Sequence, residues 1–302
     1  MHYALFIGVA VLWSSSFILM KKAGECFGPL SIGALRVLGG ALALVLLGLL
    51  LRRRWRPSPR DWTPLLVIVA IGYAWPYCLQ PFLITHHGSG FIGMMVGLVP
   101  IMTVAVSIPL LGIWPTPRQT IGVLGGFVCL AAIVGDGILR QVPPGHLALA
   151  ATVPLGYAVA NTLIKGSFAS APMLPLTMWC LGICTLVLVP IACARESVHH
   201  REALGGALAA AGVLGVLGTG LCGYAFYVLI QKRGPLFAGM VAYLIPIGAV
   251  VLGWLDRERV TLTQAMALVG IIAMVALVQA PRRAPPEPTS PPQAPVGSAS
   301  TP

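Results

Sequence analysis

The sequence predicts an all-α polytopic membrane protein with ten transmembrane helices, arranged as two inverted repeats of five helices each. Three observations lead to this fold class: the composition, the number of long apolar segments and a repeated motif. Hydrophobic residues make up 57% of the chain and charged residues only 9%, whereas a soluble domain carries about 25% charged residues. This composition excludes an ordinary soluble protein.

Ten apolar segments reach the length of about 20 residues that a helix needs to cross a bilayer. They are predicted at residues 3–20, 30–51, 63–84, 90–112, 119–136, 147–165, 173–194, 205–230, 236–255 and 262–280. The first segment lacks a basic n-region and a small-residue cleavage site, and nine more segments follow it. We therefore expect it to be kept as a membrane span.

A motif in the fourth segment returns 146 residues later, in the ninth. FIGMMVGLVP (residues 91–100) and FAGMVAYLIP (residues 237–246), each with the isoleucine that follows, agree at six of eleven positions, where chance in so apolar a chain gives about one. Each copy places a proline, Pro100 or Pro246, inside a membrane-length segment, and the proline ring removes one helical hydrogen bond. These two prolines and Pro76 are the predicted hinges.

The repeated motif indicates that one half of the chain is a duplicate of the other. We place the first five-helix repeat at residues 1–140, the second at 141–280, and a disordered, proline-rich cytoplasmic tail at 281–302. Because five is an odd number, the second repeat enters the bilayer in the opposite direction to the first. Inverted repeats are common in secondary transporters, where the substrate site lies near the midplane between the repeats.

The net charge of +11 comes from short basic clusters between the apolar segments. Such clusters favour lipid headgroups as partners and not nucleic acid. Eleven basic residues fall on one side of the predicted membrane: Arg52, Arg53, Arg54, Arg56, Arg60, Arg118, Lys165, Lys232, Arg233, Arg282 and Arg283. Seven fall on the other side: Lys21, Lys22, Arg140, Arg195, Arg201, Arg257 and Arg259. The positive-inside rule then places both termini in the cytoplasm, and the expected location is the cytoplasmic (inner) membrane of a bacterium.

Several motifs resemble the EamA type of the drug/metabolite transporter superfamily. They are Trp13-Ser14-Ser15-Ser16-Phe17, Arg36, the Gly-Met-to-Pro pattern of the fourth and ninth segments, and Glu258-Arg259-Val260-Thr261-Leu262-Thr263-Gln264. The resemblance covers nearly the whole chain except the tail, and it implies small-molecule transport, often export of amino acids or other metabolites. One feature departs from the family: the acidic residue that commonly closes the fourth segment is absent, and GIWPTP (residues 112–117) stands there.

Nine residues are candidates for substrate contacts. They are Trp13, Ser16, Arg36, Tyr73, Tyr77, Met94, Tyr157, Asn161 and Met240. The aromatic residues combine a flat apolar body with a polar tip, which suits a small organic substrate, and the flexible methionine thioethers suit a surface that repacks around its ligand. Helix packing is the alternative explanation for the aromatic and polar residues, and core filling for the methionines.

Arg36 is the permanent charge that lies well inside an apolar segment. An ionisable residue at such depth indicates function, because burying it alone costs at least about 2.5 kcal/mol. It could bind a substrate carboxylate. Alternatively, it could extend outward toward Glu25 and anchor the second helix.

No cofactor or metal is expected from the sequence. The pairs His86-His87 and His199-His200 lack further ligands at metal spacing, and neither a catalytic set nor a glycine-rich phosphate loop is found. The sequence therefore favours a non-enzymatic secondary transporter, an exporter that works by alternating access. A non-transporting membrane scaffold or receptor, and a lipid-acting membrane enzyme, are the alternatives. The substrate, the coupling ion and the oligomeric state, a homodimer included, stay open.

Overall fold

The computed structural model describes residues 2–279, except 113, 115, 140, 200, 227 and 230–240. All regular secondary structure in these residues is helical. The predicted tail and Met240 lie outside the described residues, so what the sequence predicts for them is not addressed by the fold.

The helices follow the order of the predicted segments. Those up to residue 139 are α1 (His2–Ala23), α2 (Pro29–Leu50), η1 (Pro59–Asp61), α3 (Trp62–Val67), η2 (Ile68–Ala74), α4 (Trp75–His87), α5 (Ser89–Val96), α6 (Val99–Leu111) and α7 (Pro117–Leu139). Those after residue 141 are α8 (Pro144–Ser167), α9 (Met173–Arg195), η3 (Arg201–Ala203), α10 (Leu204–Val213), η4 (Leu214–Leu221), α12 (Val241–Leu255) and α13 (Leu262–Gln279).

The helical stretches confirm a multi-pass, all-α membrane protein. Seven of them are long and apolar enough to cross a bilayer, namely Ala4–Ala23, Pro29–Leu50, Pro59–His87, Ser89–Leu111, Pro144–Ser167, Met173–Arg195 and Leu204–Phe226. Two shorter apolar stretches, Leu244–Leu255 and Leu262–Met274, follow in α12 and α13. The described helices therefore do not establish the number ten, which stays a prediction.

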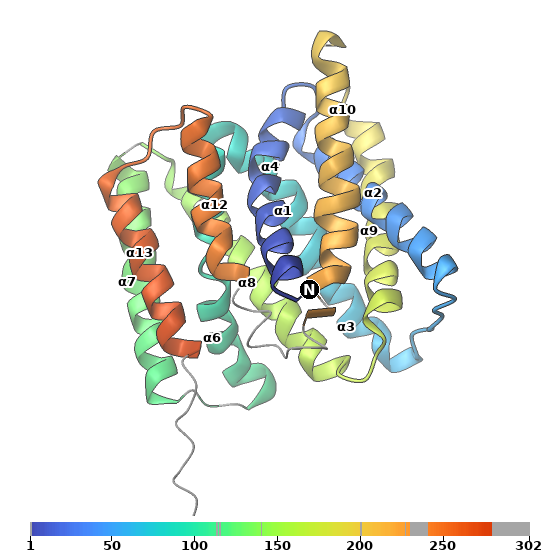
Figure 1. Ribbon diagram of the computed structural model, residues 1–302, viewed down its shortest axis with the longest axis horizontal. Coiled ribbons are helices and arrows are strands. Elements are labelled where there is room, and N and C mark those ends of the chain that lie inside the picture. The colour runs from blue at the N-terminus through green and yellow to red at the C-terminus, as the bar shows by residue number, and fades with distance from the viewer. Residues whose placement is uncertain are drawn as a thin grey trace, which may run out of the picture.

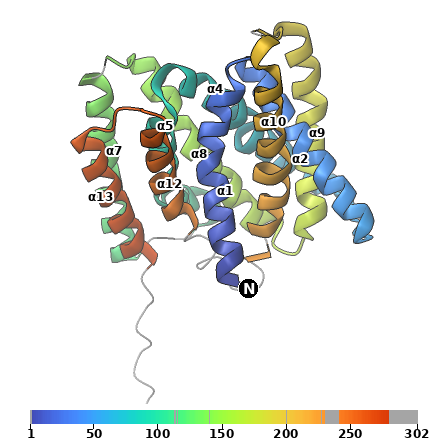
Figure 2. The same cartoon turned by 45° about the horizontal axis from the view of Figure 1, so that its top comes forward.

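The contacts between helices of the two repeats come in equivalent sets. A contact of one helix in the first repeat with one in the second has its counterpart between the equivalent helices. Helix α2 packs against α9, and α7 against α13, at opposite edges of the molecule (Figures 1 and 2). The contact of α1 with α12 has its counterpart in that of α8 with α6, and the contact of α2 with η4 has its counterpart in that of α9 with η2. This pairing is what a two-fold relation between duplicated halves requires.

Two π-helical segments interrupt the third and eighth apolar segments at equivalent places. η2 and η4 begin 146 residues apart, the same separation as the repeated motif. A π turn holds one extra residue and is frequently found at functional sites. Gly72 permits the close approach of η2 to α8, because a Cβ at this position would lie 2.5 Å from the Cβ of Ala160.

The three predicted hinge prolines lie at different kinds of places. Pro100 stands in the first turn of α6, after the turn at residues 97 and 98, where a missing N–H leaves no helical bond unmade. Pro76 stands in the first turn of α4, which continues directly from η2, so its ring removes a hydrogen bond from a continuous helical stretch. The fourth segment is broken just before Pro100, since α5 ends at Val96 and α6 begins at Val99. Pro246 lies inside α12, and Ser14 Oγ in α1 donates a hydrogen bond to the carbonyl of the preceding residue, Ile245, at 3.3 Å. The hinge role of these prolines stays a prediction.

Two remote carboxylates cap helix N-termini. Glu258, which follows α12, accepts hydrogen bonds of 2.8 Å from the backbone N–H groups of Ser89 and Gly90 in α5. Glu196, which follows α9, accepts those of Leu30 at 3.0 Å and Ser31 at 2.7 Å in α2. The first N–H groups of a helix have no partner within the helix and carry partial positive charge, so an anion there is stabilising. Each cap ties helices that are distant in sequence.

Candidate functional site

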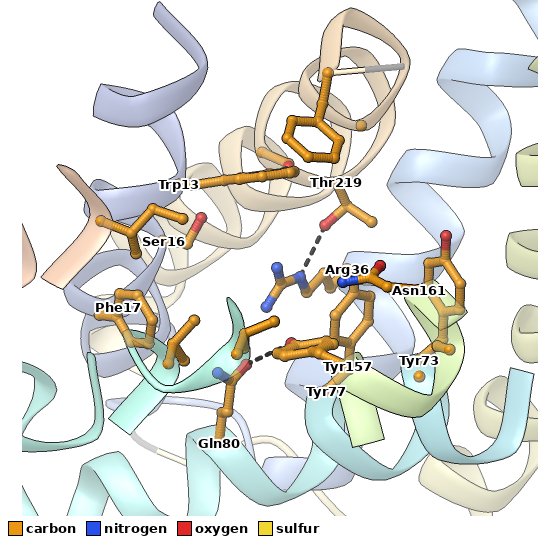
Figure 3. A pocket seen from close by; sticks show the side chains of 18 of the residues that line it. Trp13, Ser16, Phe17, Arg36, Tyr73, Tyr77, Gln80, Tyr157, Asn161 and Thr219 are labelled. Atoms are coloured by element: carbon orange, nitrogen blue, oxygen red, sulfur yellow. Dashed lines mark hydrogen bonds between the residues drawn. The ribbon is translucent and has the colours of Figure 1, made fainter. Parts of the chain in front are cut away.

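A cavity of about 200 Å³ lies between the two repeats (Figure 3). Seven of the nine predicted contact residues line it: Trp13, Ser16, Arg36, Tyr73, Tyr77, Tyr157 and Asn161. Met94 is buried away from it, beside a second cavity of about 170 Å³ that Glu258 also lines. Met240 is outside the described residues. The structure thus brings most of the candidates together, and their contact with substrate stays a prediction.

Nearly all of the cavity wall is built twice. Eighteen of the twenty-one lining residues form nine pairs at equivalent positions of the repeats, 144 or 146 residues apart. The pairs are Trp13/Tyr157, Ser16/Ala160, Phe17/Asn161, Met20/Ile164, Gly72/Gly218, Tyr73/Thr219, Tyr77/Gly223, Gln80/Phe226 and Val99/Ile245. The other three residues are Arg36, Val96 and Thr177. The cavity therefore lies where the duplicated halves face each other.

Hydrogen bonds between helices hold the aromatic walls in place. Trp13 Nε1 in α1 donates to the Gly218 carbonyl of η4 at 2.9 Å, and the Trp13 ring lies 4.9 Å from that of Phe226. The Tyr157 hydroxyl in α8 donates to Gln80 Oε1 in α4 at 3.2 Å. Each bond joins one repeat to the other. If the repeats separate to open the cavity, these hydrogen bonds have to break, or the bonded side chains have to move together.

Arg36 places a positive charge in the cavity, about 10 Å along α2 from its first residue. The side chain is 6% exposed. Its Nε donates to Thr219 Oγ1 at 2.8 Å, and its guanidinium carbon lies 3.9 Å from the centroid of the Tyr77 ring. Figure 3 shows the guanidinium between the Trp13 ring and the Tyr157–Gln80 pair. The side chain points inward, so the alternative conformation toward Glu25 is not the one in the structure.

Sequence reasoning did not select Thr219 or Thr177, although both line the cavity. A threonine in a glycine-rich helix gives no local signal of function. The repeat itself contained one for Thr219, because this residue stands 146 positions after Tyr73. A search for equivalents of each first-half candidate would have found it.

Other polar clusters lie outside the cavity. His87 Nε2 and His146 Nδ1 are 2.8 Å apart near the end of α4. Among the residues with described positions, no group of three or more His, Cys, Asp or Glu side chains could hold a metal ion. The chemistry available at the cavity is therefore binding by hydrogen bonds, aromatic faces and one guanidinium.

Comparison with known families agrees with this arrangement. The EamA-like transporter family matches residues 1–135 and 145–279, one match in each predicted repeat. The chain belongs to the EamA-like transporter family. Family membership indicates a membrane transporter, which agrees with the resemblance found in the sequence motifs.

Curated relatives of this EamA-like chain cover most of its length. The uncharacterized inner membrane transporter YedA of Escherichia coli (strain K12) is 28% identical over 283 residues, 89% of this chain and 87% of the relative. The uncharacterized transporter YoaV of Bacillus subtilis (strain 168) is 22% identical, over 85% of this chain and 89% of the relative. Protein PecM of Dickeya dadantii (strain 3937) is also 22% identical, over 89% of each chain.

A solved structure has the same fold. It is described only as a crystal structure of a protein, and it superposes with a TM-score of 0.66 at 18% identity, over 92% of this chain and 96% of the other. At this identity the likeness concerns the fold alone. Fold, family and relatives together identify a multi-pass EamA-like membrane transporter whose partners are the lipid bilayer and a small molecule.

Proposed function

We propose that this EamA-like protein is a secondary transporter that exports small organic metabolites, such as amino acids, by alternating access. The observation that supports this most directly is the cavity wall of nine repeat-equivalent pairs. In transporters built from repeats, the substrate binds between the repeats, and one bundle rocks against the other to open each side in turn. A cavity lined symmetrically by both halves is the geometry that this mechanism uses.

The rocking motion in this proposal is absorbed at three prolines of the membrane helices. The break before Pro100, the junction at Pro76 and the proline of α12, Pro246, are the hinges. The seven candidates that line the cavity contact the substrate. Met94 would join them only after the helices move, since it is now buried beside the second cavity, and Met240 is its equivalent in the second repeat.

The location and orientation belong to the same proposal. We place the protein in the cytoplasmic membrane of a bacterium with both termini in the cytoplasm, because the larger number of basic residues then faces inward and because one relative is named as an inner membrane transporter. The oligomeric state, whether a monomer or a homodimer, does not enter the mechanism, since one chain builds the whole cavity wall described here.

Transport by the purified protein tests this function. Protein in liposomes should show saturable counterflow of at least one compound from a panel of amino acids, organic acids and amines. Trp13→Phe removes the hydrogen bond to Gly218, and we expect a five- to tenfold lower flux, roughly the effect of about 1 kcal/mol. Trp114, which is 79% exposed, provides the matched control Trp114→Phe, with unchanged flux. Absence of counterflow for the whole panel would argue against a transporter.

Removing the tail distinguishes a transporter from a scaffold or receptor. Deletion of residues 281–302 leaves every described helix intact, because the last one ends at Gln279. We expect counterflow within about twofold of the full chain, a margin of less than about 0.5 kcal/mol. Loss of counterflow on deletion, with the protein still folded, would instead favour a role that depends on the tail.

A further inference from the structure

The cavity holds a permanent positive charge and no carboxylate from the described part of the chain. The sequence contains eight acidic residues. Seven lie in the described part, and none of them lines the cavity: Glu25, Asp61, Asp136, Glu196, Glu202, Asp256 and Glu258. The eighth, Glu287, belongs to the tail outside the described residues. Of the residues that the structure describes, Arg36 is the one that lines the cavity with a permanent charge of either sign.

Four of the seven described carboxylates have binding partners outside the cavity. Glu196 and Glu258 cap α2 and α5, Asp256 forms an ion pair with Lys21, and Asp136 accepts a hydrogen bond of 2.7 Å from Thr261 Oγ1. These contacts lie at helix ends, and none of the four carboxylates lines the cavity. They leave Arg36 without an anionic partner among the described residues.

The donors of Arg36 are only partly satisfied. A guanidinium has five N–H donors. Nε–H is taken by Thr219 Oγ1, whose own proton goes to the Leu214 carbonyl at 3.0 Å, so the direction of this bond is fixed. One terminal nitrogen contacts the sulfur of Met20 at 3.6 Å, a weak acceptor. Within the described residues, the terminal edge of the guanidinium has no oxygen acceptor, and this edge faces the cavity.

We infer that the cavity binds a small organic monoanion: one carboxylate on an aromatic or aliphatic body, without an ammonium group. The inference rests on the proposed transport function and changes its example substrate, from amino acids to small metabolites that carry a carboxylate and no ammonium group. The planar edge of an arginine matches a carboxylate through two parallel hydrogen bonds, and one negative charge neutralises the site. The apolar body then contacts the rings of Trp13, Tyr157 and Phe17.

A zwitterionic amino acid fits this site less well than its counterpart without the amino group. With its carboxylate on Arg36, its ammonium would stand close to the guanidinium, with only neutral acceptors such as Gln80 and Asn161 near it. Burying a second positive charge without a negative partner is unfavourable. The net charge of the ligand therefore decides affinity at this site, whatever the apolar body is.

The size of the cavity limits the body to one ring and a short chain. Its volume of about 200 Å³ is below the range of about 300–1,000 Å³ that is typical of ligand pockets. Four compounds of this size share a phenyl ring on a three-carbon chain and differ in their charged groups: 3-phenylpropionate (an anion), phenylalanine (a zwitterion), 3-phenylpropylamine (a cation) and 3-phenylpropionamide (neutral). Phenyl phosphate adds a doubly charged anion, which would leave an excess negative charge in the cavity.

Equilibrium binding to the full-length protein in nanodiscs, measured by calorimetry, tests the inference without requiring transport. We expect 3-phenylpropionate to bind at least about tenfold more tightly than the other four compounds, since bonds to charged groups are the strong ones. Arg36→Gln should remove this preference, and Arg36→Lys should retain part of it. Arg60→Gln, which removes an exposed arginine outside the cavity, should leave all five affinities unchanged.

Three results would overturn the inference. They are equal or tighter binding of any of the other four compounds, an anion affinity that Arg36→Gln leaves unchanged, and no binding of 3-phenylpropionate at all. Should Arg36→Gln fail to fold, the charge series on the unaltered protein decides. Counterflow in liposomes is measured separately. If counterflow is present but 3-phenylpropionate is not preferred, the monoanion inference is rejected and the proposed transport function is not.

Discussion

Gly156→Ala is expected to lower the melting temperature of the protein by several degrees. Gly156 lies in α8 against η2, and a Cβ on it would come closer than 3.0 Å to the carbonyl oxygen of Ile71, a separation that real side chains do not adopt. The clash is with backbone and cannot be relieved by a rotamer change. Overpacking of this kind costs about 1–3 kcal/mol or more, which corresponds to several degrees for a chain of this size.

Gly182→Ala is the matched control for this prediction. Gly182 is also inside a long helix, α9, but a Cβ on it would meet nothing within 4 Å. Alanine there should be neutral or stabilise by up to about 1 kcal/mol, because glycine is the poorer helix former. Thermal unfolding in detergent measures both variants. Equal melting temperatures for the two would show that α8 and η2 do not approach as closely as the structure has them.

Glu258→Gln is expected to destabilise the protein by about 2–3 kcal/mol. The carboxylate accepts hydrogen bonds from Ser89 and Gly90 and one of 2.9 Å from Lys21 Nζ, and hydrogen bonds to charged groups contribute about 1.5–3 kcal/mol. An amide keeps one acceptor oxygen but loses the charge at the N-terminus of α5. Denaturant or thermal unfolding should show the loss. Glu202→Gln, at an exposed residue, is the control and should change stability by less than about 0.5 kcal/mol.

The same carboxylate should make stability depend on pH. Burial raises the pKa of Glu258, but the backbone N–H groups of Gly90 and Ser89, together with Lys21, outweigh burial and hold the pKa below its ordinary value of 4.5. A depressed pKa contributes stability that is present above the unfolded-state value and is lost as the pH falls through the folded-state value. The melting temperature should therefore fall below about pH 4.5, and less steeply in Glu258→Gln. Parallel pH profiles of the two proteins would contradict this role.

The positions of the helices followed from the sequence because hydropathy depends on local composition. The described residues of each predicted apolar segment are helical, except for the turn at residues 97 and 98 and the last residues of two segments, 51 and 112. The π-helical segments were not foreseen. Their extra residue depends on the contacts of η2 and η4 with neighbouring helices, such as that of Gly72 with Ala160, and no local pattern of the sequence encodes those contacts.

The sequence predicted those site residues whose side chains are unusual in an apolar segment. Trp13, Arg36 and Asn161 stood out because polar or aromatic side chains are costly or unusual in an apolar segment, and the fold brings them to one cavity. Met94 faces a different cavity, and residue spacing did not show this, since spacing does not say which helices pack on each side of α5. The charge balance around Arg36 needed the structure, since it depends on where every carboxylate is held.

The paired π-helical segments have a consequence for how the walls could turn. An extra residue in a helix can pass along it one position at a time, and each passage rotates the intervening side chain by about 100° around the helix axis. Tyr73 and Thr219 belong to η2 and η4. Movement of the extra residue past either of them would rotate that side chain out of the cavity without bending the helix or separating it from the neighbouring helices. Each repeat thus has its own π-helical segment in which a cavity residue can rotate. The two rotations need not coincide, so Tyr73 could leave the ligand while Thr219 still contacts it, or the reverse.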